Sequence, residues 1–476
     1  MTLTHFREGL SATTQSKSLR DGMIGEGISI PGLFGDVPLV YADYVASGRA
    51  MTQVETFVAT HVLPFYANSH TEASFCGSYM TRLRREARAE IARLIGATED
   101  DAVIFTGSGA TAGLNRLVSL LGVEQADRPV VIIGPYEHHS NILPWRESKA
   151  EVIEIPEAPE GGPDLFALKA ALVTHKDADL VIGSFSAASN VTGIITDPDP
   201  VTRILKAHGA LAVWDYAGGG PYLQMDMGAG SDVRKDAIVV SPHKFPGGPG
   251  ASGVLVVNRT AVHQTCPSWP GGGTVSFVSP WGHDYSEDLA TREEAGTPNV
   301  IGDIRAALAF IVKDVVGVEE ITRREAEFNQ MAQDGWGNNP HLTLLGTENP
   351  HRLPIFSFLV KDKAGNPVHQ QLFTRMLSDI YGIQARGGCA CAGPYAHRLL
   401  GIDEEASLAL HADLAAGKEL LKPGWVRLNF SYMMDPATAQ FIIDSVNELS
   451  QRTEEFAQYY DADPATARFR GQSVAA

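Results

Sequence analysis

The sequence predicts an α/β protein with a large domain on a mainly parallel seven-stranded sheet and a smaller α+β domain. The first observation is that short apolar runs alternate with helical stretches between residues 102 and 257. The second is that most of these runs are continuously apolar, which is typical of strands covered on both faces. The third is that strands and helices begin again near residue 353, in a chain of 476 residues that is long enough for two cores.

We therefore expect three consecutive parts along the chain. Residues 1–38 form an N-terminal arm, residues 39–315 the large domain, and residues 316–476 the small α+β domain. Residues 1–31 are rich in Ser, Thr and Gly, and we expect little structure of their own there. In an alternative arrangement the N-terminal segment packs with the small domain.

Apolar periodicity gives the expected elements of both domains. The expected strands of the large sheet are 102–105, 130–134, 152–155, 180–185, 211–214, 238–240 and 254–257. The expected helices of the large domain are 52–63, 78–95, 109–121, 200–208 and 300–315. The small domain is expected to contain strands 355–360 and 425–430 and helices 369–381 and 436–449.

The composition argues against several classes of partner. A formal net charge of −18 disfavours binding to nucleic acid or to an anionic membrane surface. No apolar run approaches the roughly 18 residues of a spanning helix, and the first residues are too polar for a signal peptide. The 4 cysteines lack the spacing of a disulfide framework, which indicates a reducing compartment. We therefore expect a cytoplasmic protein without a metal site.

The most informative stretch is 237–250. A β-branched run ends at Ser241-Pro-His243-Lys244, and a loop rich in Pro and Gly follows. Ligands of α/β sheets bind at the carboxyl ends of strands. A lysine held there can form a Schiff base when burial or a nearby cation keeps its amine neutral. Taken alone, the motif also fits a solvated lysine in a hairpin loop.

Other expected strands also end in polar groups. The loop 106–113 opens a helix with small residues, which suits a phosphate, although such a loop is as often a tight turn. His138 can stack on a ring, Asn190 can donate to an oxygen, and Asp215 needs a cationic partner because its strand is apolar. Together with Lys244, these groups match the phosphate, ring face, phenol oxygen, ring nitrogen and aldehyde of pyridoxal phosphate.

Four motifs carry a resemblance to a known family. They are Asp43-Tyr-Val-Ala-Ser47, Glu137-His-His-Ser-Asn141, Ser241-Pro-His-Lys244 and Glu294-Ala-Gly-Thr-Pro-Asn299. With them the chain, from about residue 39 to 447, resembles the class V, fold-type I pyridoxal-phosphate enzymes of the cysteine desulfurase and selenocysteine lyase group. The resemblance implies the fold of these transferases.

The resemblance also implies roles for the residues that would bind the cofactor. Lys244 would form the Schiff base, Asp215 would pair with the pyridine nitrogen, and His138 would stack on the ring and exchange the proton of the substrate thiol. The residues that would hold the phosphate are Ala110, Thr111, Ser241 and His243.

Three further positions follow from the same resemblance. Asn190 would face the substrate carboxylate and the ring oxygen. Thr297, with the Gly271-Gly-Gly273 turn, would reach the phosphate of the neighbouring subunit, which implies a homodimer with shared active sites. The chain departs from the family at Gly218, where a glutamine usually bonds the phenolic oxygen.

The loop Arg386-Gly-Gly-Cys389-Ala-Cys391 indicates the type of reaction. Cys391, five residues after Arg386, matches the sulfur-accepting cysteine of desulfurases. The alternative interpretation is that Cys391 is a small buried thiol without a catalytic role. Arg386 and His397 lie close in sequence and favour a reactive thiol. Cys389 makes the match less clean, because a Cys-x-Cys pair can also be redox-active. Arg427 matches the arginine that clamps the substrate carboxylate, and Arg386 is a second substrate-binding candidate.

The C-terminal half is most similar to the desulfurase-like domain of molybdenum-cofactor sulfurase. The likeness covers the Cys-x-Cys loop, the helix His397-Arg-Leu-Leu-Gly-Ile402 and the strand Val426-Arg-Leu-Asn-Phe-Ser-Tyr-Met433. The insert 403–422 is longer than in simple desulfurases. A counterpart of the sulfurase's additional C-terminal domain is not expected, so transfer of sulfur to molybdenum cofactor is not predicted.

We predict a pyridoxal-phosphate-dependent, cysteine desulfurase-like enzyme that removes sulfur from L-cysteine. Its products would be alanine and a persulfide on Cys391, and a sulfur-acceptor protein would be a partner. One alternative is a class V aminotransferase or epimerase that acts on another amino acid, with Cys391 a bystander. The other is a non-catalytic sulfur carrier or partner-binding protein, against which Lys244 and Asp215 argue.

Overall fold

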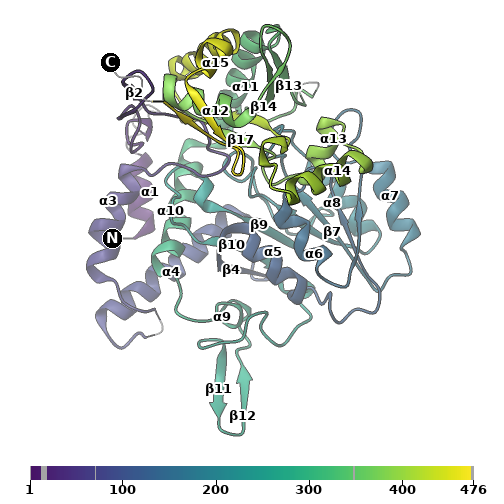
Figure 1. The fold of residues 1–476 in the computed structure, drawn as a ribbon. Coiled ribbons are helices and arrows are strands. Elements are labelled where there is room, and N and C mark those ends of the chain that lie inside the picture. The colour runs from purple at the N-terminus through teal and green to yellow at the C-terminus, as the bar shows by residue number, and fades with distance from the viewer. Residues whose placement is uncertain (1, 12–18, 70, 347–348, 473–476) are drawn as a thin grey trace. The chain divides into compact units, whose positions relative to one another are not determined.

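A computed structural model describes residues 2–11, 19–69, 71–346 and 349–472, which divide into two compact units (Figure 1). Unit 1 takes the described residues of 1–23, 47–188 and 195–318. Unit 2 takes those of 24–46, 189–194 and 319–476. The units are therefore not consecutive in sequence, because two short segments of unit 2 interrupt unit 1.

The prediction of an arm with little structure is wrong at its first residues. Helix α1, Leu3–Ser11, buries Leu3, Phe6 and Leu10 and contacts helices of unit 1. These three residues recur at helical spacing, but the polar residues between them hide the pattern in a composition-based reading. The later part of the arm forms the hairpin β1 (Ser29–Pro31) and β2 (Asp36–Pro38), which belongs to unit 2. Residues 12–18 lie outside the described residues.

Unit 1 is built on the predicted seven-stranded sheet, in the order β4-β10-β9-β8-β7-β5-β6. Each strand lies within two residues of its expected bounds: β4 Asp101–Gly107, β5 Pro129–Ile133, β6 Glu151–Glu154, β7 Leu180–Ser186, β8 Leu211–Asp215, β9 Ala237–Val240 and β10 Gly253–Asn258. Strands β5 to β9 are paired in parallel, whereas β10 is antiparallel to both β9 and β4. The mainly parallel sheet is thus confirmed, with one reversed strand.

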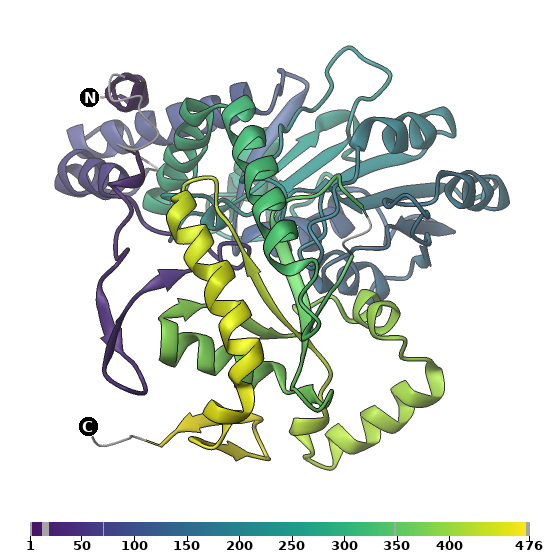
Figure 2. The same cartoon turned by 90° about the horizontal axis from the view of Figure 1, so that it is seen from above.

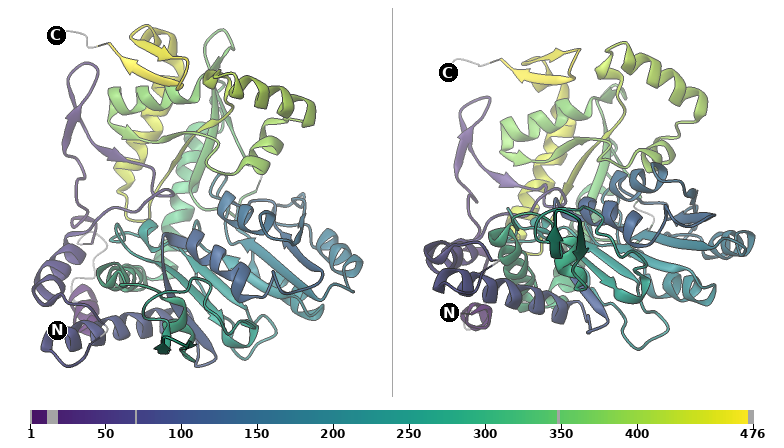
Figure 3. Two further views of the ribbon diagram at one scale, coloured as in Figure 1. Left: turned by 60° about the horizontal axis from the view of Figure 1, so that its bottom comes forward. Right: turned by 90° about the horizontal axis from the view of Figure 1, so that it is seen from below.

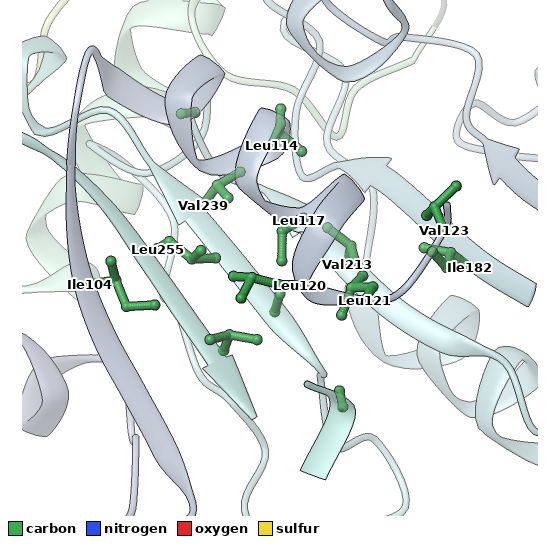
Figure 4. Close-up of a cluster of buried hydrophobic side chains, with 14 of the residues drawn as sticks. Ile104, Leu114, Leu117, Leu120, Leu121, Val123, Ile182, Val213, Val239 and Leu255 are labelled. Atoms are coloured by element: carbon green, nitrogen blue, oxygen red, sulfur yellow. The ribbon is translucent and has the colours of Figure 1, made fainter. Parts of the chain in front are cut away.

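Helices cover this sheet on both faces. In Figure 4, Leu114, Leu117 and Leu120 of α5 point at Val239 and Leu255 of the sheet, where all five side chains are fully buried. This packing explains the continuous apolar runs of the buried strands, whereas β6, at the edge of the sheet, is partly exposed. The helices and helical turns of unit 1 after α1 are α3 Thr52–Phe57, η1 Val58–Val62, η2 Leu63–Phe65, α4 Phe75–Leu94, α5 Gly109–Leu120, η3 His139–Asn141, α6 Leu143–Arg146, α7 Leu165–Thr174, α8 Pro198–Ala207, η4 Pro242–Lys244, η5 Arg259–Ala261, α9 Leu289–Glu293 and α10 Val300–Val316.

A hairpin of unit 1 extends away from this sheet (Figure 1). Its strands are β11 (Val275–Ser279) and β12 (Gly282–Tyr285), which pair with each other only. Trp281, at its tip, is 92% exposed. Within the described ranges, no helix combines the length and the apolar character that crossing a bilayer requires.

Unit 2 contains an antiparallel sheet in the order β13-β14-β18-β17, with helices packed on it. Helix α15 lies beside α11 in Figure 2, and Trp336 Nε1 donates to the Ile443 carbonyl between them. The predicted strands and helices of this part are present as β14, β18, α12 and α15. Its elements after the β1–β2 hairpin are β3 Val40–Tyr41, α11 Val318–Trp336, β13 Leu342–Leu344, β14 Ile355–Lys361, β15 Pro367–Val368, α12 Gln370–Tyr381, β16 Ile383–Gln384, β17 Arg386–Gly388, α13 Gly393–Leu400, α14 Glu404–Ala415, η6 Glu419–Leu421, β18 Trp425–Asn429, α15 Pro436–Ala457, β19 Tyr460–Asp463 and β20 Arg468–Gly471.

The insert 403–422 is largely helical, with α14 and η6. Asp403 caps α14 by accepting from the Ala406 amide, and the helix buries none of its residues. Figure 3 shows α14, in yellow-green, at the margin of unit 2. Its link to the preceding helix α13 is a hydrogen bond at 2.9 Å between His397 Nε2 and Ser407 Oγ.

Candidate active site

The structure brings the predicted site residues together in two groups, one within each unit. In unit 1, Lys244 ends the turn that directly follows β9. The Gly48 amide fixes this turn by donating to the His243 carbonyl at 2.9 Å. Burial lowers the pKa of His243 to about 4, and the charge of Lys244 contributes to this shift. The His243 ring is therefore neutral at pH 7.

The expected phosphate seat lies at the N-terminus of α5. The Ala110 amide donates to Ser241 Oγ at 2.9 Å. Gly109 has a left-handed backbone (φ 61°), and a Cβ there would lie 2.9 Å from both Ser241 Oγ and His243 Cε1. Only glycine allows this close approach of the helix start to Ser241 and His243. Three of the four residues expected to hold the phosphate thus lie side by side, at a helix end that favours an anion.

Thr111, the fourth of these residues, is linked to His138 through Ser140. Thr111 Oγ1 lies 2.7 Å from Ser140 Oγ, which lies 3.0 Å from His138 Nδ1. The Ser140 amide also donates to His138 Nδ1 at 3.1 Å. A neutral His138 ring therefore carries its proton on Nε2. Ser140 was not among the predicted site residues, although it stands within the Glu-His-His-x-Asn motif.

Two buried carboxyl groups follow strands β8 and β5. Asp215 ends β8, is 3% exposed and accepts from the Ala217 amide at 2.7 Å. Burial raises the pKa of Asp215, and the Ala217 hydrogen bond and the charge of Lys244 oppose that shift. Burial also raises the pKa of Glu137, to about 7, against hydrogen bonds from Ser186 and Asn141. No role for Glu137 is predicted from the sequence, although its place in the motif 137–141 is a signal for one.

In unit 2, the two expected substrate arginines share one carboxylate. Arg386 and Arg427 are cross-strand partners on β17 and β18. Arg386 donates to Asp43 Oδ2 from Nε at 3.0 Å and from Nη2 at 2.9 Å, and Arg427 Nη2 donates to Asp43 Oδ1 at 3.0 Å. Asp43 belongs to the motif 43–47, but the sequence predicts no function for it.

Arg427 and Asn190 also leave polar atoms open. Arg427 Nη1 donates to the Asn190 carbonyl at 3.0 Å. Arg427 Nε and Asn190 Oδ1 are buried without a hydrogen-bond partner. Such groups normally find partners, so a buried donor and a buried acceptor in this arrangement favour a polar ligand. Burial lowers the pKa of Arg427, and the charge of Asp43 opposes the shift.

Cys391 lies on a strained turn, residues 389–392, which we call the thiol turn. The Ala392 amide donates to the Cys389 carbonyl at 3.2 Å, and Ala390 (φ 53°) and Cys391 (φ 56°) are both left-handed. For residues other than glycine this backbone costs roughly 1 to 2 kcal/mol each. Asn190 Nδ2 donates to the Ala390 carbonyl at 2.8 Å. Cys391 is exposed and Cys389 is half-buried.

Four predicted positions need separate description. Asn190 lies in unit 2 with Arg427 and the thiol turn. Thr297 is exposed on the loop before α10, which is tied to the glycine turn because the Gly296 amide donates to the Gly272 carbonyl at 2.8 Å. Gly218 offers no side chain for the phenolic oxygen. The His397 nitrogens are bonded to the Gly393 carbonyl and to Ser407.

The family model of the class-V aminotransferases matches residues 40–413. The chain belongs to the class-V aminotransferase family. Enzymes of this family depend on pyridoxal phosphate. Among curated relatives, a probable cysteine desulfurase from Halalkalibacterium halodurans is 27% identical over 359 residues, which cover 75% of this chain and 85% of the relative. Another from Pyrococcus abyssi is 29% identical over 377 residues, covering 76% and 88%.

Solved structures of cysteine desulfurases share the fold. A cysteine desulfurase from Thermococcus onnurineus superposes with a TM-score of 0.71 at 24% identity, covering 87% of this chain and 94% of the other. A cysteine desulfurase from Escherichia coli superposes with a TM-score of 0.68 at 21% identity, covering 91% and 98%. The seven-stranded sheet and the antiparallel sheet of this chain are therefore those of the family fold. The specific likeness to molybdenum-cofactor sulfurase stays a prediction.

Proposed function

We propose that this chain is a pyridoxal-phosphate-dependent cysteine desulfurase of the cytoplasm that acts on L-cysteine. The observation that carries the proposal is the thiol turn. It presents an exposed Cys391 next to Asn190, which is itself bonded to the buried Arg427. The curated relatives described above, named as probable cysteine desulfurases, support this choice.

The groups of unit 1 fit pyridoxal phosphate. Ser241, His243 and the start of α5 form a seat for an anion, and Thr111 adds a hydroxyl. Asp215 is a buried carboxyl group that a protonated ring nitrogen would keep ionised. His138 would lie against the ring with its Nε2 proton. When bound, the cofactor supplies an electron-accepting ring that makes the substrate Cα proton acidic. Lys244 would hold the cofactor covalently and then accept that proton.

The groups of unit 2 would bind and attack the amino acid. The open Arg427 Nε would donate to the substrate carboxylate, and Arg386 would add a second cation. Cys391 would attack the substrate sulfur, so that an S–S bond forms and the substrate Cβ–S bond breaks. The balance is one L-cysteine and one thiol to one L-alanine and one persulfide. The sulfane sulfur would then pass to an acceptor, for which a sulfur-acceptor protein is our proposal.

We also propose a homodimer with shared active sites. The β11–β12 hairpin pairs with no other strand and exposes Phe277, Val278 and Trp281. A two-stranded hairpin is marginally stable by itself, and contiguous exposed apolar side chains favour a protein partner. Thr297 lies on the loop bonded to the neighbouring glycine turn and would reach the phosphate bound by the partner subunit.

The test is incubation of the purified protein with L-cysteine while alanine and sulfide are assayed. With dithiothreitol present to reduce the persulfide to thiol and sulfide, equal release of both is expected, and without a reductant the mass spectrum should show a persulfide on Cys391. Cys391→Ser should still bind the cofactor and exchange the Cα proton with solvent, but sulfur release should fall by about three orders of magnitude, because a hydroxyl cannot accept sulfane sulfur. Cys389→Ser, the matched control, should lose far less.

The second candidate is a class-V aminotransferase or epimerase acting on another amino acid. The match to the class-V aminotransferase model favours it. It uses the same groups of unit 1 and leaves Cys391 without a role. If Cys391→Ser turned over amino acids as fast as the parent, this candidate would replace the desulfurase.

A further inference from the structure

Asn190 occupies the centre of a hydrogen-bonded chain within unit 2. Its carbonyl accepts from Arg427 Nη1, and Nη2 of the same guanidinium group donates to Asp43. Its side-chain amide donates at 2.8 Å to the carbonyl of Ala390, in the middle of the thiol turn. One residue thus joins the arginine proposed for the substrate carboxylate to the turn that carries Cys391.

Several hydrogen bonds hold the segment around Asn190. The Ser189 side chain accepts from the amides of Val191 and Thr192, at 3.2 and 3.1 Å. The Val191 carbonyl accepts from Ser357 Oγ of β14 at 2.7 Å. Thr192 Oγ1 lies 3.2 Å from the hydroxyl of Tyr395, on the helix that follows the thiol turn. Asn190 therefore lies on a segment that is anchored to β14 and to α13, the helix that follows the thiol turn.

The thiol turn itself needs such a support. Ala390 and Cys391 are the two central residues of the turn, and both have a left-handed backbone that only glycine adopts without penalty. The turn closes with one backbone hydrogen bond, between the Ala392 amide and the Cys389 carbonyl. Of the described contacts, the bond from Asn190 is the one that ties its strained centre to the rest of unit 2. Without it, an extended backbone would be favoured at residues 390 and 391.

We infer that Asn190 is a positioning residue for Cys391, holding the thiol turn in its strained conformation beside Arg386 and Arg427. The inference rests on the proposed function only for the role of Cys391 as the acceptor of the substrate sulfur. It differs from the role implied by resemblance, in which Asn190 faces the substrate and the cofactor. The Nδ2 group serves the turn, while the open Oδ1 stays available to a ligand.

The consequence for Cys391 is a cationic setting. β17, with Arg386, runs directly into the thiol turn, and Arg427 lies opposite Arg386 on β18. Burial lowers the pKa of both arginines, and the charge of Asp43 raises it. The sulfur of Cys391 is close enough to raise the pKa of each arginine as well. A negatively charged alkylating reagent should therefore react with Cys391 faster, relative to a neutral one, than with a cysteine away from these arginines.

The experiment compares iodoacetate with iodoacetamide on the full-length, cofactor-loaded protein in a Cys389→Ser background. Mass spectrometry gives both rates for Cys391 and for Cys266, an exposed cysteine of unit 1 that serves as internal reference. The iodoacetate-to-iodoacetamide ratio of Cys391 should exceed that of Cys266 by about fivefold, the factor expected for one nearby unit charge in water. The ratio cancels general accessibility, because both reagents meet the same thiol.

Asn190→Ala should lower the Cys391 ratio to that of Cys266, since the released turn moves away from the arginines. Adding Ala390→Asn should restore the ratio, because asparagine tolerates the left-handed backbone and re-forms the turn without the tie. Ala390→Asn alone should leave the ratio at the parent value. If Asn190→Ala does not fold, Asn190→Leu preserves the side-chain volume and removes the same hydrogen bond.

An unchanged ratio in the Asn190 variant, or a lowered ratio that Ala390→Asn does not restore, would overturn the inference. The measurement involves no turnover. A protein without desulfurase activity would still show the Asn190-dependent ratio, and an active desulfurase with an unchanged ratio would refute this inference alone.

Discussion

Asp43 holds two arginines that differ in their surroundings. The Arg427 side chain is 4% exposed, whereas that of Arg386 is 51% exposed. A buried charge that loses its partner is costly, while a half-exposed charge recovers solvation by water. Asp43 therefore stabilises the folded state mainly through its ion pair with the buried Arg427. The half-exposed Arg386 can respond to a ligand.

This difference gives the first prediction. Asp43→Ala should lower the free energy of unfolding by about 3 kcal/mol, because it strands the buried Arg427. Arg386→Ala, the matched control, removes a half-exposed partner of the same carboxylate and should cost about 1 kcal/mol or less. Urea denaturation followed by circular dichroism measures both. Equal losses in the two variants would show that burial does not separate these arginines.

Single residues mark where the sequence stops being informative. Lys244, Ser241, His243 and Ala110 could be grouped in advance, because each follows a strand whose apolar run is plain in the sequence. Asn190 was assigned to the same strand ends by the same rule, yet it belongs to unit 2 and bonds to a turn 200 residues later. Periodicity predicts where a strand ends, but it does not predict which distant loop a side chain will contact.

At the scale of elements, burial decided what could be predicted. The seven strands of unit 1 were recognisable because their apolar runs are continuous, as the cover of helices on both faces requires. The hairpin β11–β12 was missed since its side chains are exposed and give no apolar alternation. The reversal of β10 was missed for another reason: an apolar run has the same pattern in both directions.

The packing of β10 against the start of α5 gives the second prediction. A Cβ at Gly253 would lie 2.3 Å from the Gly109 carbonyl oxygen, so Gly253→Ala must displace backbone next to Ala110 and Ser241. Loss of one hydrogen bond to a charged phosphate weakens binding about tenfold or more. We expect that loss of affinity for pyridoxal phosphate, measured by absorbance titration. Gly9→Ala, in helix α1, is the control, because nothing lies within 4 Å of its Cβ, and it should leave the cofactor affinity unchanged.

At the scale of the whole molecule, the proposed dimer gives the third prediction. Lys244→Ala and Thr297→Ala proteins, mixed after reversible dissociation, should form hybrids with one site whose lysine and threonine are both intact. Random pairing makes half of the dimers hybrid, so about a quarter of the parent activity should return. Activity no higher than in the two separate variants would argue against a site shared between subunits.

The dependence of stability on pH gives the fourth prediction, in which two buried groups of unit 1 act in opposite directions. The folded-state pKa of Glu137 is raised from 4.5 to about 7, chiefly by burial. Between these values the folded state binds more protons than the unfolded state, so stability falls as pH rises. The folded-state pKa of His243 is lowered from 6.5 to about 4, chiefly by burial and further by Lys244. In that window the unfolded state binds more protons, so stability rises with pH.

From about pH 4.5 to 6.5 the two slopes, each near 1.4 kcal/mol per pH unit, should nearly cancel in the parent protein. His243→Gln removes the rising contribution, so its free energy of unfolding should fall as pH increases through this window. Glu137→Gln removes the falling contribution, so its free energy of unfolding should rise over the same window. Urea denaturation of the cofactor-free proteins at three pH values measures these slopes. If both variants kept the slope of the parent, the opposing titration of Glu137 and His243 would be refuted.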